Sequence, residues 1–422
     1  MADRQREAGD ELASLAHLIA AQTLENPGQA PTALLNVATG YFTKGDHEAA
    51  LYWYGLLLRL DPGIASAHQN LAAIHSARGD EAQADLSRER AYRLQRVFIE
   101  DWPDARRRLL ILCTGRTAGN IPYEALLSRS PSTRIKYVID FADPAEDAQL
   151  PPHDGVFNAI GEPDVAVQLG ERLRAFVEQS RVPLLNPPQA VERTRRHQLP
   201  ALLDGLAGVE TAPCQRFEAP AASLADLAHR LAQSDIALPA LIRPVASHGG
   251  AGLQRCETLE ELAMAAETIG GAHYLTSCID ARSADGFYRK YRIVFIGGEP
   301  HAYHLAISPN WMVHYFSADM LAHDWKLEED RRFTEDPAGV LGEEKMAAIR
   351  AIGGRLMLDY AGIDFTLLPD GRILVFEANA TMLVHGERSM GPLAFRNAAI
   401  QRMAEAFERM LQVRIGSLAD MR

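Results

Sequence analysis

The chain has 422 residues, of which 47% are apolar and 23% are charged, so it is long enough for two to four domains of ordinary globular composition. Its formal net charge is -12. This charge argues against a general nucleic-acid binder, because neutralising a phosphate backbone requires clustered Lys and Arg.

The cysteines and the hydropathy of the sequence indicate the cellular compartment. None of the four cysteines lies in a CxxC pair, so neither a zinc site nor a disulfide framework is indicated, and a reducing compartment fits best. The first residues are polar and lack an apolar signal segment, and no window approaches the roughly 18 uninterrupted apolar residues of a membrane span. The sequence therefore predicts a cytoplasmic protein with neither a nucleic-acid nor a membrane partner.

An internal repeat occupies residues 31–98 and recurs roughly every 34 residues. The Gly-Asp pair at 45–46 returns at 79–80, and Ala50 returns as Ala84. Small residues let two antiparallel helices approach closely, and the Gly-Asp pairs suit the tight turn between them. The pattern resembles the tetratricopeptide repeat, and an additional amphipathic helix is predicted over 11–24.

Two interpretations of the repeats stay open. Stacked repeats leave a concave surface, which favours a groove for a peptide or protein partner. The alternative is a packing or dimerisation module, which would make the chain a homo-oligomer.

Beyond a charged linker at 101–108 the pattern changes to strands alternating with helices. Such alternation predicts an α/β unit with a mainly parallel sheet. The predicted strands are 109–115, 134–141, one within 154–164, and one within 182–188, and the predicted helices are 121–128 and 165–180.

A glycine-rich loop follows a predicted strand that carries Arg243. Glycines let backbone N–H groups approach a phosphate without a Cβ clash. The loop residues that could contribute are Ser247, Gly249, Gly250 and Gly252. By itself this segment is more typical of a plain hairpin tip.

A hairpin around Gly297-Gly298 comes next, and its first strand carries Lys290 and Arg292. Cations at this place can meet a polyphosphate as charge-assisted donors, or they can simply be solvated.

A second hairpin, residues 360–385, carries Asp364 on one strand and Glu377 and Asn379 on the other. Glu377 and Asn379 are two apart, so they point to the same face of the strand. Two carboxylates and an amide oxygen make the hard oxygen environment that suits Mg²⁺.

These three segments in this order resemble the ATP-grasp superfamily, especially its glutathione synthetase and ribosomal-protein glutamate ligase branch. The resemblance rests on the runs IRP…SHGGAG, KYR and D…FEANA. It implies a multidomain chain of N-terminal all-α tetratricopeptide helical repeats (1–105), an α/β pre-ATP-grasp domain (106–190) and an α+β ATP-grasp catalytic domain (191–422). It also implies ATP and Mg²⁺ as cofactors.

The resemblance assigns roles to individual residues. Arg292 and Lys290 would act on the transferred phosphoryl group, and Asp364, Glu377 and Asn379 would bind Mg²⁺. The nucleotide would be held by a hinge within 274–279, by the glycine-rich loop and by two basic positions where the family has Lys. One is Arg243, and at the other the chain offers Arg195, Arg196 and His197. The predicted nucleotide-binding residues are Thr276, Cys278, Ile279, Arg243, Ser247, Gly249, Gly250, Gly252 and Arg195.

The implied reaction is ATP-dependent ligation of a carboxylate to an amine through an acylphosphate, with release of ADP and phosphate. The substrates would be small molecules or amino acids. Two alternatives stay open: a peptide or protein substrate recruited by the repeats, and a non-catalytic nucleotide-responsive scaffold.

Polar and aromatic residues after the Arg292 hairpin suggest where the substrate binds. The predicted substrate residues are His304, Ser308, Trp311, His314 and Arg388. The alternative is that Trp311 and Tyr315, four residues apart, cover the core.

Overall fold

The computed structural model describes Ser14 and residues 30–116, 119–247 and 249–416. The helix predicted over 11–24 lies outside this part of the chain, apart from Ser14. Internal contacts divide the chain into two units, one comprising residues up to 98 with 114–117 and 136–150, the other 99–113, 118–135 and 151–422. Within the described residues no helix is both long enough and apolar enough to cross a membrane.

The α-helices of the described residues are α2 (Ala30–Thr43), α3 (His47–Leu60), α4 (Ala65–Ala77), α5 (Glu81–Leu94), α6 (Pro163–Gln168), α7 (Gly170–Gln179), α8 (Pro188–Glu192), α9 (Leu199–Leu203), α10 (Leu224–Gln233), α11 (Leu259–Ile269), α12 (Asp324–Glu335), α13 (Pro337–Leu341), α14 (Glu343–Leu356) and α15 (Arg396–Ile415). The 3-10 helices are η2 (Ile139–Phe141), η3 (Pro144–Gln149), η4 (Tyr315–Ser317) and η5 (Met320–Ala322).

The strands are β1 (Val97–Glu100), β2 (Arg107–Cys113), β3 (Ser132–Val138), β4 (Gly155–Asn158), β5 (Leu184–Leu185), β6 (Val209–Thr211), β7 (Cys214–Phe217), β8 (Ala240–Pro244), β9 (Gln254–Cys256), β10 (His273–Ser277), β11 (Tyr288–Ile296), β12 (Glu299–Ser308), β13 (Tyr360–Leu367) and β14 (Ile373–Asn379). The predicted mixture of a helical N-terminal region and α/β structure is confirmed.

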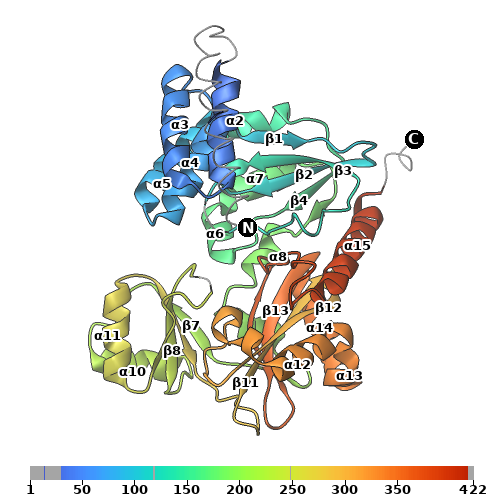
Figure 1. Cartoon of the computed structure of the whole chain (residues 1–422). Coiled ribbons are helices and arrows are strands. Elements are labelled where there is room, and N and C mark those ends of the chain that lie inside the picture. The colour runs from blue at the N-terminus through green and yellow to red at the C-terminus, as the bar shows by residue number, and fades with distance from the viewer. Residues whose placement is uncertain (1–13, 15–29, 117–118, 248, 417–422) are drawn as a thin grey trace. The chain divides into compact units, whose positions relative to one another are not determined.

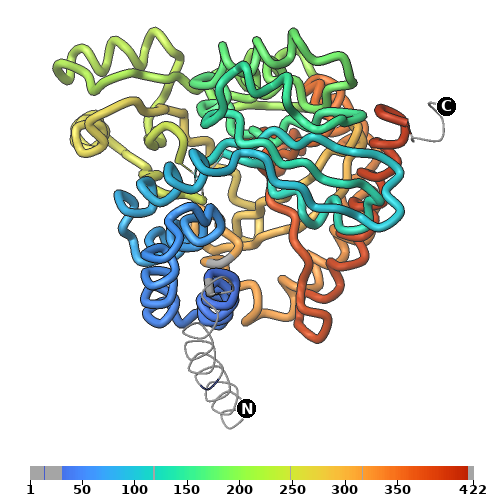
Figure 2. The backbone as a smooth tube through the Cα atoms, turned by 90° about the horizontal axis from the view of Figure 1, so that it is seen from above, coloured from blue at the N-terminus to red at the C-terminus, as the bar shows by residue number. Residues whose placement is uncertain are grey.

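The repeat region folds into two helical hairpins, α2–α3 and α4–α5, which Figure 2 draws in shades of blue. Asp46 and Asp80 cap α3 and α5 by accepting backbone hydrogen bonds, and a glycine at positive φ precedes each cap. Ala50 and Ala84 are fully buried, as close helix approach requires. The helices are where the repeat pattern predicts them, whereas their identity as tetratricopeptide repeats stays a prediction.

The α/β region contains a five-stranded sheet in the order β1-β3-β2-β4-β5, in which β2, β4 and β5 run parallel. The four predicted strands are confirmed. The edge strand β1 was not predicted, because its four residues follow a helix directly and are too short to show a period. The boundary predicted at residue 105 falls between β1 and β2.

Two helix predictions in this region need correction. Residues 121–128 form turns and no helix. Pro122 donates no backbone hydrogen bond, and Pro131 disfavours helical backbone at Ser130, so at most the seven residues between them could be helical. The helix predicted over 165–180 is two helices, α6 and α7, which meet at Leu169 beside Gly170, a poor helix former.

The region from 209 onward is built from two sheets (Figure 1). The smaller has the order β7-β10-β8-β9, and α10 and α11 pack on it around a core that includes Leu227, Ile242 and Leu262. The larger has the order β12-β11-β13-β14-β6. Its β11–β12 hairpin turns at Gly297-Gly298, both at positive φ, as predicted.

Candidate functional site

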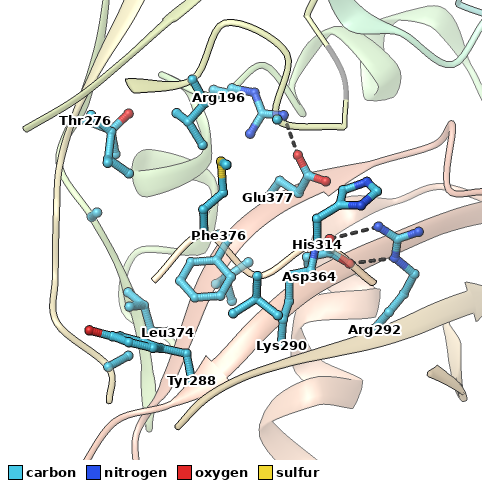
Figure 3. A pocket seen from close by; sticks show the side chains of 18 of the residues that line it. Arg196, Thr276, Tyr288, Lys290, Arg292, His314, Asp364, Leu374, Phe376 and Glu377 are labelled. Carbon is cyan, nitrogen blue, oxygen red and sulfur yellow. Dashed lines mark hydrogen bonds and ion pairs between the residues drawn. The ribbon is translucent and has the colours of Figure 1, made fainter. Parts of the chain in front are cut away.

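A cavity of about 540 Å³ is lined by residues of both C-terminal sheets and of the segment between β12 and α12. One end is lined by hinge residues of β10 and its continuation, the middle by charged residues of β8, β11, β13 and β14, and the other end by β12 and the start of α15. Figure 3 shows the first two parts. The three sequence segments with predicted chemistry are thus brought to one cavity.

The floor of the cavity is a single row of side chains across the larger sheet. Glu377 pairs in register with Asp364, Asp364 with Arg292, and Arg292 with His304. Directly paired residues of neighbouring strands point to the same face, so four strands deliver two carboxylates, a guanidinium and an imidazole side by side. A register shift follows Asp364 on β13 and another follows Arg292 on β11, so the row lies where the ladders are irregular.

Asp364 is buried and is held by both predicted catalytic cations. Arg292 binds it in a bidentate pair, with Nε to Oδ1 at 2.6 Å and the second nitrogen to Oδ2 at 2.8 Å, and Lys290 Nζ lies 3.1 Å from Oδ2. Burial alone would raise the pKa of Asp364, but the charges of Arg292 and Lys290 outweigh it and hold the pKa well below its usual range. The carboxylate is therefore ionised at neutral pH.

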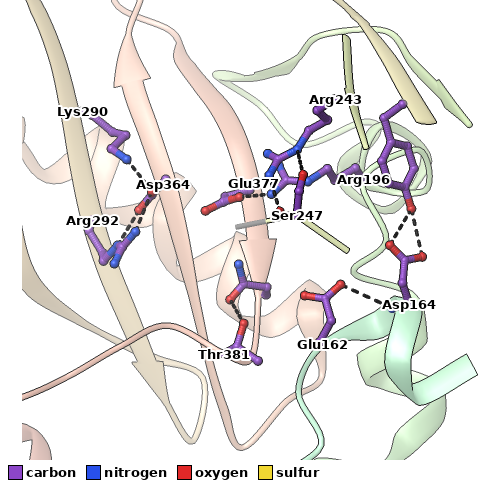
Figure 4. A network of polar contacts seen from close by, with 12 residues as sticks. Glu162, Asp164, Arg196, Arg243, Ser247, Lys290, Arg292, Asp364, Glu377 and Thr381 are labelled. Carbon is purple, nitrogen blue, oxygen red and sulfur yellow. Dashed lines mark hydrogen bonds and ion pairs between the residues drawn. The ribbon is translucent and has the colours of Figure 1, made fainter. Parts of the chain in front are cut away.

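Glu377 pairs with Arg196, whose guanidinium donates to Oε2 (Figure 4). Burial alone would raise the pKa of Glu377, but the charges of Arg196, Lys290 and Arg292 together outweigh it and lower the pKa. The structure distinguishes Arg195, the predicted nucleotide-binding arginine, from its neighbour Arg196. Arg195 turns its Nε to the Glu192 carbonyl and is not among the described residues that line the cavity, whereas its neighbour Arg196 is. Within one turn of chain, tertiary packing decides which of two adjacent arginines faces the site.

The residues predicted to hold Mg²⁺ line the cavity together. Asp364 and Glu377 are paired in register, and the Asn379 side-chain oxygen accepts from Thr381 at 3.2 Å. An ionised carboxylate offers about four lone-pair positions, so the bonds from Arg and Lys leave places for a cation. This all-oxygen donor set fits Mg²⁺. No group of three or more His, Cys, Asp or Glu placed for a metal occurs among the described residues.

The glycine-rich loop closes over the cavity from the smaller sheet. Gly249 and Gly250 line the cavity at positive φ, and a Cβ at either position would come within 3.6 Å of His314 or 3.5 Å of Met312. Gly252 lies outside the lining, and there a Cβ would meet Pro244 at 2.8 Å, so only glycine fits the turn. His248 lies outside the described residues.

Arg243 lines the cavity and is tied to the loop. Its Nε donates to the Ser247 hydroxyl at 3.1 Å and a terminal nitrogen donates to the Ser247 carbonyl, so Ser247 shapes the loop and does not line the large cavity. Burial and the neighbouring charge of Arg196 lower the pKa of Arg243 to about 10. Two cations so close together favour an anionic ligand between them.

The predicted hinge residues Thr276, Cys278 and Ile279 line the opposite, more apolar end of the cavity. Leu374, Phe376 and Tyr288 lie in the same part of the cavity (Figure 3). Apolar and aromatic side chains at this end of the cavity suit a heteroaromatic ring.

The predicted substrate residues divide into two groups. His304, Trp311 and His314 line the cavity. Ser308 and Arg388 are not among the described residues that line it, and their substrate role stays a prediction. The Ser308 hydroxyl, at the end of β12, accepts from the Asn310 backbone at 3.1 Å, and Arg388 is exposed on the segment between β14 and α15.

The arginine that does line this end is Arg396, in the first turn of α15. The sequence carried a signal for this residue, because Arg396 is in register with the apolar face of α15 formed by Ala399, Ile400, Met403 and Phe407, and an arginine on such a face is unusual.

A second polar network lies beside Arg196 and Arg243 (Figure 4). Asp164 of α6 accepts from the Tyr274 hydroxyl at 3.0 and 3.1 Å and from Arg216 at 3.3 Å, so it joins the α/β region to β10 and β7. Glu162, two residues earlier, is buried. Burial, followed by the charge of Asp164, raises the pKa of Glu162 to about 7. These two acids were not predicted.

The raised pKa of Glu162 predicts a pH-dependent stability. A carboxyl whose pKa is higher in the folded state binds extra protons there, so stability falls as pH rises from 4.5 to about 7. Glu162→Gln cannot ionise, and it should exceed the wild type in free energy of unfolding by roughly 3 kcal/mol at pH 8 and by little near pH 4. Urea unfolding at both pH values measures this. The exposed Glu257→Gln serves as the control, and an equal difference at both pH values would contradict the assignment.

Comparisons with known proteins complete the description. No family model matches the sequence, and no curated protein matches it. Similar solved structures include D-alanyl-alanine synthetase A from Vibrio cholerae, at 14% identity, covering 73% of this chain and 98% of that one, with a TM-score of 0.45. They also include a RimK domain ATP-grasp protein from Sphaerobacter thermophilus, at 15% identity, 72% and 99% coverage and a TM-score of 0.43. The L-amino acid ligase from Bacillus licheniformis is similar at 16% identity, 74% and 75% coverage and a TM-score of 0.43. An ATP-grasp protein, a synthetase and a ligase are thus among the chain's structural neighbours.

Proposed function

We propose that the chain is an ATP-dependent carboxylate–amine ligase, which forms an amide or peptide bond through an acylphosphate and releases ADP and phosphate. One observation carries the proposal: the row from Glu377 through Asp364 to Arg292 lies in a cavity that also contains Arg196, Arg243 and a glycine-rich loop. The cavity therefore combines carboxylates that suit a metal, cations that suit phosphates and apolar residues that suit a nucleotide base.

In this proposal the adenine occupies the end formed by Thr276, Cys278 and Ile279. The phosphates extend toward Arg243, Arg196 and the backbone of the loop at 249–250. Lys290 and Arg292 meet the γ-phosphate. Mg²⁺, held by Asp364, Glu377 and Asn379, supplies charge neutralisation on the phosphate oxygens when it is bound.

The reaction then needs no side-chain nucleophile. A substrate carboxylate oxygen attacks the γ-phosphorus, the bond to the β-phosphate oxygen breaks, and ADP leaves. The nitrogen of an amine attacks the carbonyl carbon of the acylphosphate, the carbon–oxygen bond to phosphate breaks, phosphate leaves, and the nitrogen loses a proton. Arg292 and Lys290 orient the transferring group and balance its charge, so catalysis comes from positioning and electrostatics.

The helical hairpins leave a second proposal open, in which they recruit a peptide or protein that the ligase modifies. The observation that favours it is the exposure of large apolar side chains on these helices, namely Tyr52, Leu60, Leu86 and Leu94. Exposed apolar surface of this kind is typical of interaction sites.

The nucleotide product of the reaction tests the acylphosphate mechanism. We expect ADP and phosphate to form in equal amounts with the ligated product, and neither AMP nor pyrophosphate, because the proposal has Lys290 and Arg292 act on the terminal phosphate. Purified full-length protein, incubated with ATP, Mg²⁺ and pooled amino acids and short peptides, can be analysed by nucleotide chromatography. AMP as the stoichiometric product would exclude the acylphosphate route, and no nucleotide product at all would favour the scaffold interpretation.

A further inference from the structure

The end of the cavity beyond Arg292 contains two buried groups that the mechanism above does not use. His304 is 7% exposed and Arg396 is 2% exposed, and both line the cavity. His304 is the last member of the cross-strand row, on the edge strand β12, and Arg396 begins α15. The ring of Tyr315 lies between them, with its centroid 5.3 Å from the His304 ring and 4.3 Å from Arg396 Cζ.

Each group has a nitrogen with unused hydrogen-bonding capacity. Nδ1 of His304 and Nε of Arg396 are buried and carry no hydrogen bond to the described residues. A buried polar atom without a partner costs about 1–3 kcal/mol, so such atoms are rare in a folded protein unless something binds them. Two of them around one aromatic ring, both in the lining of one cavity, indicate a ligand.

The two groups are held rigidly. Asp330 of α12 accepts from the Leu305 backbone N–H at 2.8 Å and from the Arg396 guanidinium, so one carboxylate fixes both β12 and α15. Glu387 adds a second contact to Arg396 at 3.4 Å. A preorganised pair of this kind loses little entropy when a ligand binds.

The electrostatic environment indicates the sign of the ligand. Burial, and then the charges of Arg292 and Arg396, hold the pKa of His304 well below its usual range, so its ring is neutral. Burial and the charges of Lys290 and Arg292 likewise lower the pKa of His314. At both rings the neighbouring cations disfavour a positive charge more than Asp364 favours one, so this end of the cavity favours an anion.

We propose that His304 and Arg396 form a subsite for a carboxylate that stays intact during the reaction, and that this carboxylate belongs to the amine substrate. The inference rests on the proposed ligase function. The carboxylate that becomes phosphorylated must lie at Arg292 and Lys290, so it cannot also occupy the subsite. Arg396 Nε–H donates to one oxygen of the intact carboxylate, and the His304 ring, in the tautomer with hydrogen on Nδ1, donates to the other.

The subsite selects a class of substrate. Because His304 and Arg396 are almost fully buried, only a small group can reach them. A free amino acid or a short peptide carries a carboxylate close to its amine, whereas the lysine side chain of a protein and a polyamine do not. The amine substrate is therefore a free amino acid or a short peptide that keeps its carboxylate.

A binding experiment tests the subsite directly. Full-length protein with Mg²⁺ and the non-hydrolysable analogue AMP-PNP is titrated in a calorimeter with L- and D-amino acids and glycine, and with the corresponding amino-acid amides. We expect at least one amino acid to bind, and its amide to bind about 10- to 100-fold more weakly, because a charge-assisted pair of hydrogen bonds is lost. Equal binding of acid and amide, or no binding by any amino acid, would overturn the proposal.

Two variants assign the effect to the residues. Arg396→Lys keeps a positive charge beside Asp330 but removes the Nε–H, and His304→Phe fills the same space without ring nitrogens. Each should weaken binding of the amino acid about tenfold or more and reduce the preference for the acid over the amide, while AMP-PNP affinity stays unchanged. The matched controls are Arg414→Lys on the same helix, where Arg414 pairs with Asp359, and His301→Gln on the same strand. If both variants prefer the acid over the amide as strongly as the controls do, the proposed subsite is wrong. If Arg396→Lys does not fold, the result for His304→Phe alone decides.

The result separates the subsite from the ligase proposal. ADP formation is measured with the same compounds and ATP. Carboxylate-dependent binding without ADP formation would remove the ligase proposal and leave the subsite standing. ADP formation with equal rates for acids and amides would remove the subsite and leave the ligase proposal standing.

Discussion

Replacing Glu377 by Gln is expected to lower the rate of ADP formation by about 100- to 1000-fold, the usual loss when one preorganised electrostatic group is removed from an active site. Glu377 is the first residue of the cross-strand row. It is both a predicted Mg²⁺ ligand and the partner of Arg196. Glutamine keeps the shape and can still accept a hydrogen bond from Arg196, so the fold should survive. The loss should be largest at low Mg²⁺, because a neutral amide binds the ion more weakly.

The measurement is ADP release as a function of Mg²⁺ concentration. Glu210→Gln is the matched control, because Glu210 lies on the neighbouring strand β6 and pairs with Arg372 outside the cavity lining. A folded Glu377→Gln protein with a rate within a few-fold of the control would remove Glu377 from the metal site.

Replacing Arg292 should have the other large effect, and it separates catalysis from stability. Arg292→Lys keeps a charge beside Asp364 but loses the bidentate geometry, so we expect ADP formation to fall by about 1000-fold or more while the protein stays folded. Arg292→Met removes the charge altogether. It leaves the buried Asp364 with Lys290 alone and should lower the free energy of unfolding at pH 7 by about 3–5 kcal/mol.

The pH dependence of Arg292→Met follows from the direction of the Asp364 pKa. That pKa is depressed in the folded protein, so the ion pair contributes stability above the ordinary pKa of an aspartate and loses it as pH falls. The difference between Arg292→Met and the wild type should therefore shrink in acid. Arg289→Lys is the control on the same strand, because Arg289 pairs with Asp285 and Glu329 away from the row. Equal rates for Arg292→Lys and this control would contradict the assigned role.

Much of the site could be predicted because its signals are local. The turns at Gly297-Gly298 and Asp370-Gly371 are short-range, and each sets the pairing of the two strands that flank it. The two-residue spacing of Glu377 and Asn379 is likewise enough to place them on one face. The helix caps Asp46 and Asp80 depend only on their own helices. Sequence reasoning therefore reached the hairpins, the helical repeats and most of the charged residues in the cavity.

Other features depend on contacts between segments far apart in the chain. Arg195 and Arg196 are indistinguishable as sequence, and only the packing of the 188–203 region against β14 decides that Arg196 reaches Glu377. Ser308 and Arg388 have the right chemistry for a substrate site, but one ends a strand and the other lies exposed, whereas Arg396 is carried into the cavity by α15.

The sequence by itself determined the order of the elements, the strand faces and the set of charged residues available for nucleotide chemistry, because turns, caps and periodicity act over a few residues. Tertiary structure alone decided which of those residues meet. The row from Glu377 to His304 requires three separate strand pairings, with register shifts after Arg292 and Asp364, and the approach of Arg396 requires Asp330 on another helix. Turns set the two hairpin pairings, but the pairing of Arg292 with Asp364 joins one hairpin to the other. Its register is set by burial of whole sheet faces, a sum over many distant side chains that no local pattern contains.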